Sequence, residues 1–386
     1  MSDTTPLADA DVIVLGLGAM GSAAAWHLAR RGARVLGVDR WTPPHAAGST
    51  HGRTRVIREA YYEAPAYVPL VRRAYELWTA LERESGRTLF RRTGGIMLGA
   101  SDGELVSGAR RSAREHALPH EDLSAADVRR RLPILALPDD MVGLWEPRAG
   151  ILFPELCVST VLDLAQRHGA VLRLGERVVR WHVGGDAVVV TTDRAHLRAR
   201  RLVLAAGPWL PSLAPDLSVP LAVERQVMHW FAPRARAELF RAEGCPVLMV
   251  EHAPGRMFYT IPDVGHGVKA AVHHDGDPAD PDAPRLPVQA QETRVLRELL
   301  DRFLPDANGP LLAAETCLYT NTPDRHFLLG AHPAHPQVIV ASACSGHGFK
   351  FASVVGEIVA DLALDGGTAH DITPFGFARF VGGGAR

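Results

Sequence analysis

The chain has 386 residues, a formal net charge of -1, 22% charged residues and 47% hydrophobic residues. This length exceeds one simple core, so we expect one large domain with a lobe or two interwoven domains. The balanced charge gives no basic excess for nucleic acid or an anionic membrane, which leaves small molecules as the expected partners. The polar start "MSDTTPLADA" and the absence of a long apolar run predict a cytoplasmic protein without a membrane segment.

The first 39 residues predict a βαβ unit. "DVIVLG" is typical of a short buried strand, "SAAAWHLARRGA" of a helix and "RVLGVD" of a second strand. Between the first strand and the helix, Gly16, Gly18 and Gly21 form G-x-G-x-x-G, and Asp39 closes the second strand. Glycines at these positions permit the tight turn, the approach of backbone to a pyrophosphate and close helix-strand packing, while Asp39 is placed to bind a ribose.

This fingerprint predicts a dinucleotide but does not separate FAD from NAD. Arg40, beside Asp39, suggests a handle for an NADP phosphate, although an acidic residue at position 39 disfavours that interpretation.

The remaining elements follow in chain order. Apolar spacing predicts helices over 66–86 and 122–133, with Ser124 as an N-cap and Asp127 in the first turn. The run 201–213 predicts a buried strand that ends in Ala-Gly-Pro, the alternation over 223–275 predicts a mixed or antiparallel sheet, and 275–287 predicts a surface connection rich in Pro and Asp. A strand, a glycine turn and a helix are expected again over 337–364. A cofactor domain interrupted by a substrate lobe is therefore predicted.

Other chemistries find little support. The cysteines lack C-x-x-C spacing, which argues against a zinc site or a disulfide framework. "HPAHP" at 332–336 is broken by proline and has no thiol or carboxylate array beside it, so no metal site is predicted. Neither a G-x-x-x-x-G-K-[ST] loop nor a G-x-S-x-G elbow is present.

Four segments resemble the monomeric sarcosine oxidase and N-methyltryptophan oxidase family of flavoproteins. They are residues 43–78, which include "GSTHGRTRVIREAYYEA", then "GVKAAVH", "ETCLYTNTPDRHF" and "SGHGFKFASVVGE". The similarity is collinear over nearly the whole chain. It implies an α/β (α+β) fold, a monomer, and a Rossmann-like FAD-binding domain that is discontinuous (1–82, 150–222 and 320–386). A mixed-sheet substrate domain would comprise 83–149 and 223–319.

The resemblance further implies that Cys317 carries FAD through the 8α position of the flavin. Without the resemblance, the commoner interpretation of a cysteine at this position is a small buried hydrophobic residue. A thiolate is, however, nucleophilic enough to add to the methyl-bearing edge of a flavin. Cys344 stands where the family has no cysteine, and we interpret it as core.

The same resemblance assigns the basic residues. Arg58 and Lys350 would hold the substrate carboxylate, Arg55 would lie close to the flavin, Lys269 would activate O2, and His273 would lie in the substrate pocket. From the residues alone, without the resemblance, non-catalytic interpretations stay open. They are a solvated basic patch for the arginines, an edge-strand lysine, a lysine turned to solvent and a structural histidine.

Aromatic and apolar pocket positions match the family at Tyr61, Tyr259, Tyr319 and Met249, and ordinary core is their alternative. Gly346 and Gly348 would let a turn approach the flavin closely. Further cofactor contacts are implied for Ala19, Met20, Arg40, Gly48, Ser49, His51, Arg55, Val178, Gly207, His347, Phe349 and Lys350.

Two departures from the family leave the amine substrate open. Thr50 and Arg53 replace a usual His and Asp, which adds a cation beside the flavin loop, and "AYYEA" at 60–64 replaces "AYGEG". The expected reaction is oxidation of a secondary amine in an N-methyl (N-alkyl) or cyclic amino acid to an imine, with O2 reduced to H2O2. Alternatives are a biosynthetic oxidase or desaturase of a cyclic imine or modified amino acid, a flavin dehydrogenase that uses a carrier, and a nucleotide-binding redox regulator without turnover.

Overall fold

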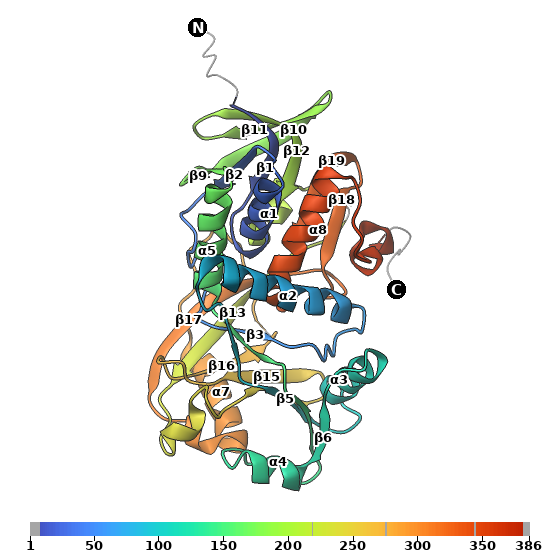
Figure 1. The fold of residues 1–386 in the computed structure, drawn as a ribbon. Coiled ribbons are helices and arrows are strands. Elements are labelled where there is room, and N and C mark those ends of the chain that lie inside the picture. Colours follow the sequence, from blue (N-terminus) through green and yellow to red (C-terminus); the bar gives the residue numbers. More distant parts are fainter. Residues whose placement is uncertain (1–7, 218, 275, 343–344, 381–386) are drawn as a thin grey trace.

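The structure, a computed structural model, describes residues 8–217, 219–274, 276–342 and 345–380, so Cys344 lies outside the described residues. It has two main parts, and helix α2 (Tyr67–Ser85) crosses between them (Figure 1). The first and last described elements, β1 (Ala8–Leu15) and the 3-10 turn Phe377–Phe380, belong to the same part (Figure 1). No helix within the described ranges combines the length and the apolarity that crossing a bilayer requires.

The first part is built on a sheet with the strand order β10-β11-β12-β1-β2-β9, in which β19 also pairs with β12 and β18. Strands β1, β2, β9, β12 and β19 pair in parallel. Helix α1 contacts both α5 and α8 beside this sheet. The bounds are β1 (Ala8–Leu15), α1 (Ala19–Arg30), β2 (Val35–Asp39), α5 (Pro154–Arg167), β9 (Val171–Leu174), β10 (Val178–Gly184), β11 (Ala187–Thr192), β12 (His196–Leu204), β18 (Leu328–His332), β19 (His335–Ser342) and α8 (Ala352–Leu364).

The predicted βαβ unit is confirmed, because β1 and β2 are parallel neighbours joined by α1. The helix begins at Ala19, directly after Gly18, and so includes the last glycine of the fingerprint. The buried strand predicted to end in Ala-Gly-Pro is confirmed, and its observed end lies slightly earlier. Strand β12 ends at Leu204, and a 3-10 turn and the short helix α6 (Leu210–Leu213) follow, since proline at 208 and 211 cannot donate to a sheet.

The second part is a sheet with the order β17-β13-β16-β15-β14-β5-β7-β6, antiparallel except for the pair β14 and β5. It confirms the sheet predicted over 223–275. Strand β16 lies inside it, so the alternative of an edge-strand lysine at 269 is wrong. The bounds are β5 (Gly95–Gly99), α3 (Glu104–Glu115), β6 (Glu121–Ser124), α4 (Ala125–Arg131), β7 (Val142–Glu146), β13 (Ala222–Phe231), β14 (Val247–Ala253), β15 (Arg256–Ile261), β16 (Val268–His273), α7 (Ala290–Phe303) and β17 (Leu311–Asn321).

A small sheet of β3 (Arg55–Ile57), β8 (Gly150–Leu152) and β4 (Phe90–Arg92) completes the strands of the described residues. The predicted cap of α4 is confirmed, because Ser124 Oγ accepts from Asp127 N while Asp127 Oδ2 accepts from Ser124 N, each at 3.2 Å. The 3-10 turns are Gly207–Trp209, Ala237–Phe240, Pro305–Ala307, Phe349–Phe351, Thr373–Phe375 and Phe377–Phe380.

Candidate active site

A cavity of about 390 Å³ extends from the glycine turn after β1 to strands β13, β15, β16 and β17. Most of the predicted site residues line it. They are Gly16, Gly18, Ala19, Met20, Asp39, Arg40, Gly48, Ser49, Arg55, Arg58, Val178, Gly207, Met249, Tyr259, His273, Cys317, Tyr319, Gly346, His347, Gly348, Phe349 and Lys350.

Four predicted residues do not line the cavity, and each lies against a residue near its wall. A Cβ added at Gly21 would lie 1.7 Å from the Gly16 carbonyl oxygen, so this position packs the helix against the turn. His51 Nε2 lies 2.9 Å from the Thr316 carbonyl oxygen, and burial lowers the pKa of His51 to about 4, which keeps its ring neutral. Of the other two, Tyr61 contacts the charged groups of Arg58 and Lys350, and Lys269 donates to backbone carbonyl oxygens.

Cys317 lies in β17, buried with Met228 and Trp230, and among the described residues it is the cysteine that lines the cavity. Cys157 and Cys245 are buried in other parts of the core. Burial raises the pKa of the Cys317 thiol, while the cations Arg55, Lys269 and Arg285 act in the opposite direction. The pKa of the thiol is raised overall, so these cations only partly offset the cost of burying a thiolate.

Lys269 is 1% exposed and lies on β16, which is separated from the strand of Cys317 by β13. Its Nζ donates to the carbonyl oxygens of Gly52 and Thr54, each at 2.9 Å, and lies 5.4 Å from the centre of the Trp230 ring. Burial and the charge of Arg55 hold the pKa of Lys269 well below its usual range. Its chain neighbours on β16 pack into the core on the other face of the sheet, as alternation predicts.

Arg58 is 3% exposed, so the alternative of a solvated patch is wrong for this residue. Its Nη2 donates to both carboxylate oxygens of Glu63 at 2.8 Å, and its Nη1 donates to the Ala60 carbonyl oxygen at 3.0 Å. The guanidinium carbon lies 4.2 Å from the ring centre of Tyr61 and 4.9 Å from that of Tyr62. Burial alone would lower the pKa of Arg58, but the Glu63 carboxylate together with Tyr61 and Tyr62 outweighs burial, so the pKa is raised.

Lys350 is 6% exposed and belongs to the 3-10 turn Phe349–Phe351 just before α8, so the alternative of a lysine turned to solvent is wrong. Its Nζ donates to the His347 carbonyl oxygen at 2.8 Å and to Tyr61 Oη at 3.4 Å. Burial and the neighbouring charge of Arg58 lower the pKa of Lys350 to about 7.

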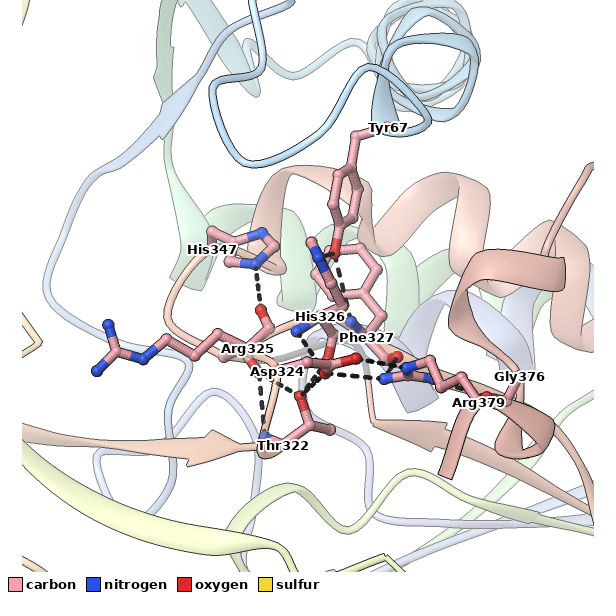
Figure 2. Close-up of polar contacts among 10 residues, drawn as sticks. Tyr67, Thr322, Asp324, Arg325, His326, Phe327, His347, Gly376 and Arg379 are labelled. Carbon is pink, nitrogen blue, oxygen red and sulfur yellow. Dashed lines mark hydrogen bonds and ion pairs between the residues drawn. The ribbon is translucent and has the colours of Figure 1, made fainter. Parts of the chain in front are cut away.

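His347 connects this lysine to the loop that follows β17. Its Nδ1 lies 2.6 Å from Tyr61 Oη, and its Nε2 lies 3.1 Å from the Arg325 carbonyl oxygen, a contact drawn in Figure 2. That loop is in turn held by Asp324, whose carboxylate accepts from Arg379 near the C-terminus (Figure 2). Tyr61 is thus connected through His347 to the loop after β17, and this loop is held by Arg379 near the C-terminus.

The added cation at Arg53 does not reach the cavity. Its guanidinium pairs with Glu315 at 3.0 Å and lies 4.5 Å from the centre of the Trp230 ring. Arg55 does line the cavity, where its Nη2 donates to the Ser49 carbonyl oxygen at 3.0 Å. Arg40 forms an ion pair with Asp282.

The chain resembles known proteins over nearly its whole length. The model of the FAD dependent oxidoreductase family (DAO) matches residues 11–362. The chain belongs to this family. It is 47% identical to monomeric sarcosine oxidase from Streptomyces avermitilis over 95% of the chain and 96% of that protein. It is 36% identical to N-methyl-L-tryptophan oxidase from Salmonella arizonae over 96% of the chain and 99% of that protein.

A solved structure shares the same fold. NikD, described as an unusual amino acid oxidase essential for nikkomycin biosynthesis, is 29% identical, with a TM-score of 0.83 over 96% of this chain and 97% of that one. The predicted resemblance and fold class are therefore confirmed, and the protein is a flavoprotein amine oxidase of the sarcosine oxidase type.

The residues present fit an FAD in the cavity. Gly16 has a φ of +85°, and a Cβ there would lie 2.6 Å from the Ala205 carbonyl oxygen, so the turn admits only glycine. Helix α1 begins at the cavity with no acidic residue in its first turn, which favours a pyrophosphate. Ser49 Oγ is buried at the cavity without a hydrogen-bond partner and offers a donor to a ligand.

Sequence reasoning missed three residues that shape this flavin site. Glu63 stands in the loop at 60–64, and its charge close in sequence to Arg58 was a usable signal. Arg285 comes from the connection predicted to be surface, yet it is partly buried and donates to the carbonyl oxygens of Thr316 and Ala47. Glu155 Oε1 accepts from the backbone nitrogens of Gly52 and Arg53 at 2.8 and 3.0 Å, and nothing in the sequence points to it.

Proposed function

We propose that this oxidase acts on the secondary amine of an N-methyl or other N-alkyl amino acid, or of a cyclic amino acid. The observation that carries the proposal is the pair of buried cations, Arg58 and Lys350, in the same cavity as Cys317. Two fixed cations in an otherwise largely apolar pocket favour a ligand with a carboxylate. The names of the relatives at 47% and 36% identity support the N-methyl class.

The side chains would place the substrate for reaction. Arg58 and Lys350 hold the carboxylate, and Tyr259, Tyr319 and Met249 form a wall that excludes water from the amine. When bound, FAD would take a hydride from the carbon next to the nitrogen and pass the electrons to O2, giving H2O2. The imine product would then hydrolyse in water to an amine and an aldehyde.

The flavin would be attached through Cys317, with Lys269 serving the reaction with O2. Attachment replaces the S–H hydrogen and one hydrogen of the 8α methyl group by a C–S bond, and the two electrons released leave by way of the ring to O2. The cations near the thiol support this step because they favour the nucleophilic thiolate. In its protonated form, Lys269 offers a positive charge where superoxide would form.

The test is a screen of N-methyl, N-alkyl and cyclic amino acids, with O2 uptake, H2O2 and aldehyde measured together. One H2O2 per amine oxidised is expected. Substrate turnover only with an added electron carrier would show a dehydrogenase, and failure of every amine to bleach the flavin would contradict the proposal.

Attachment has a separate test. After denaturation, the yellow colour should stay with the wild-type peptide and with Cys245→Ser, the matched control for another buried thiol, but leave Cys317→Ser. Colour lost from fully loaded wild type would contradict attachment. We further expect a cytoplasmic monomer, and gel filtration of the loaded enzyme checks the oligomeric state.

A second candidate is a biosynthetic oxidase of a cyclic imine carboxylate. The divergent loop at 60–64 and the similarity to NikD favour it. Cyclic imine carboxylates therefore belong in the same screen, and a kcat/KM for them far above that for any N-methyl amino acid would support this candidate.

A further inference from the structure

Three possible metal ligands meet away from the flavin cavity. His332 ends β18, His335 begins β19, and Asp216 comes from the segment after α6. Asp216 Oδ2 lies 3.4 Å from His332 Nε2 and 3.7 Å from His335 Nε2, and all three ligand atoms lie within 4.8 Å of one another. In the sequence, no carboxylate stands beside "HPAHP", and no metal site was predicted there. The fold brings the carboxylate of Asp216 to both histidines.

The fold holds these side chains in place before any ion binds. His332 and His335 are paired across the β18-β19 hairpin, and their rings stack with centres 5.0 Å apart. Trp181 meets both rings edge-on, at 5.9 and 5.6 Å between centres. Its Nε1 donates to the Leu213 carbonyl oxygen at 2.7 Å, which ties the segment carrying Asp216 to the same tryptophan.

His332 supplies a second observation that points to a ligand. The residue is 2% exposed, and apart from the long 3.4 Å contact with the Asp216 carboxylate its Nε2 has no hydrogen-bond partner among the described residues. Its Nδ1 accepts from Ala334 N at 3.2 Å, so an ion at Nε2 would move the ring proton to Nδ1 at the expense of that one turn contact. The side chains of His335 and Asp216 are 34% and 48% exposed, which leaves room for water to complete a coordination shell.

We propose that Asp216, His332 and His335 bind a divalent transition-metal ion of the zinc class. Two imidazoles and one carboxylate match the ligand preference of such ions, with water as a fourth ligand. With metal-ligand distances of about 2.0–2.1 Å, neighbouring tetrahedral ligands lie roughly 3.4 Å apart, close to the two separations from Asp216. The distance between the two histidine ligand atoms, which lies within 4.8 Å, is the one that ion binding would have to shorten.

The site is structural rather than catalytic, because none of the three residues lines the flavin cavity. A bound ion would tie the segment before β13 to the β18-β19 hairpin. It would stabilise the folded protein, since an ion that binds only the folded state shifts unfolding by mass action.

The experiment titrates ZnCl2 into tag-free, flavin-loaded enzyme that has been stripped with EDTA, by calorimetry and by thermal melting. Wild type should bind about one ion per chain and melt at a higher temperature with zinc. Asp216→Asn and His335→Gln, both at partly exposed positions, should bind zinc more weakly by at least about 10- to 100-fold, since changes even to outer-shell partners cost that much. Circular dichroism checks that the variants fold.

His182→Gln is the matched control. His182 is exposed and shares a surface hollow with Trp181, Asp216 and His335, but it is not one of the three ligands. It should bind zinc as wild type does. No binding by wild type, or equal binding by wild type, Asp216→Asn and His335→Gln, would overturn the proposal.

Discussion

Arg58 Nη2 contacts both oxygens of the Glu63 carboxylate at 2.8 Å, so the guanidinium proposed for the substrate already holds a carboxylate of its own chain. Both side chains line the flavin cavity, and both are largely buried. A substrate carboxylate must therefore displace Glu63 or share Arg58 with it. Glu63 is common to "AYYEA" at 60–64 and to the family sequence "AYGEG", so the competition does not come from the changes at Tyr62 and Ala64.

Glu63→Gln should accordingly tighten the binding of carboxylate ligands. Removing the competing charge leaves Arg58 with a neutral partner, and a gain of about tenfold corresponds to about 1.4 kcal/mol. The measurement is the Kd of propionate, a carboxylate that is not oxidised, from its perturbation of the flavin spectrum, together with KM for the best amine.

Glu76→Gln is the control for this change, because it removes a carboxylate from an exposed pair with Arg73 outside the cavity. It should leave Kd and KM unaltered. Weaker binding of propionate in Glu63→Gln would show that Glu63 supports ligand binding instead of competing with it.

Lys350 should make carboxylate binding depend on pH. Its pKa is lowered to about 7, so the free enzyme carries this cation below pH 7 and loses it above. An anion binds the protonated form, and the Kd of propionate should therefore rise toward about tenfold per pH unit above pH 7. Lys350→Arg, which stays charged, should abolish the dependence, whereas Lys350→Met should bind weakly at every pH. A flat wild-type profile from pH 6 to 9 would contradict the assignment.

Local patterns made much of the fold predictable from sequence. The glycine spacing and apolar runs up to Asp39 depend on neighbouring residues, and β1, α1 and β2 follow from them. Bringing Arg58, Cys317 and Lys350 to one cavity required the resemblance, because nothing local relates segments so far apart.

Contacts between residues far apart in the chain could not be predicted from the sequence for the same reason. The contacts of Arg285 with Thr316 and of Asp216 with His332 depend on how connections cross the finished fold. Position 285 lies in a Pro/Asp-rich stretch with every sign of a solvated loop, and only the tertiary structure turns its guanidinium inward. The end of β12 near Leu204 was predictable, by contrast, because the Ala-Gly-Pro sequence that follows marks where the strand gives way to a turn.

Lys269→Met should slow the reaction with O2 more than the reaction with substrate. Loss of a preorganised charge beside a developing anion lowers a rate constant by about 10²- to 10³-fold. Reoxidation of the flavin by O2, measured by stopped flow, should slow by that order, while reduction of the flavin by substrate without O2 should change little. The pKa of Lys269 is held well below its usual range by burial, so wild-type reoxidation should slow as pH rises and the variant should lack this dependence. Equal losses in both half-reactions would identify Lys269 instead as an anchor for the Gly52 and Thr54 carbonyls.

Gly346→Ala tests the close approach of the glycine turn to the proposed substrate wall. Gly346 has a φ of +80°, and a Cβ there would lie 2.5 Å from Tyr319 Cε2, so the change adds a clash to a backbone cost of about 1–2 kcal/mol. Chemical denaturation should show a larger loss of stability than in Gly366→Ala, whose φ is +78° and whose Cβ would meet no atom within 4 Å. KM should also rise in Gly346→Ala alone, because Tyr319 must move into the cavity or away from it. If the two variants lose equal stability and both keep the wild-type KM, Tyr319 merely fills space and does not shape the substrate pocket.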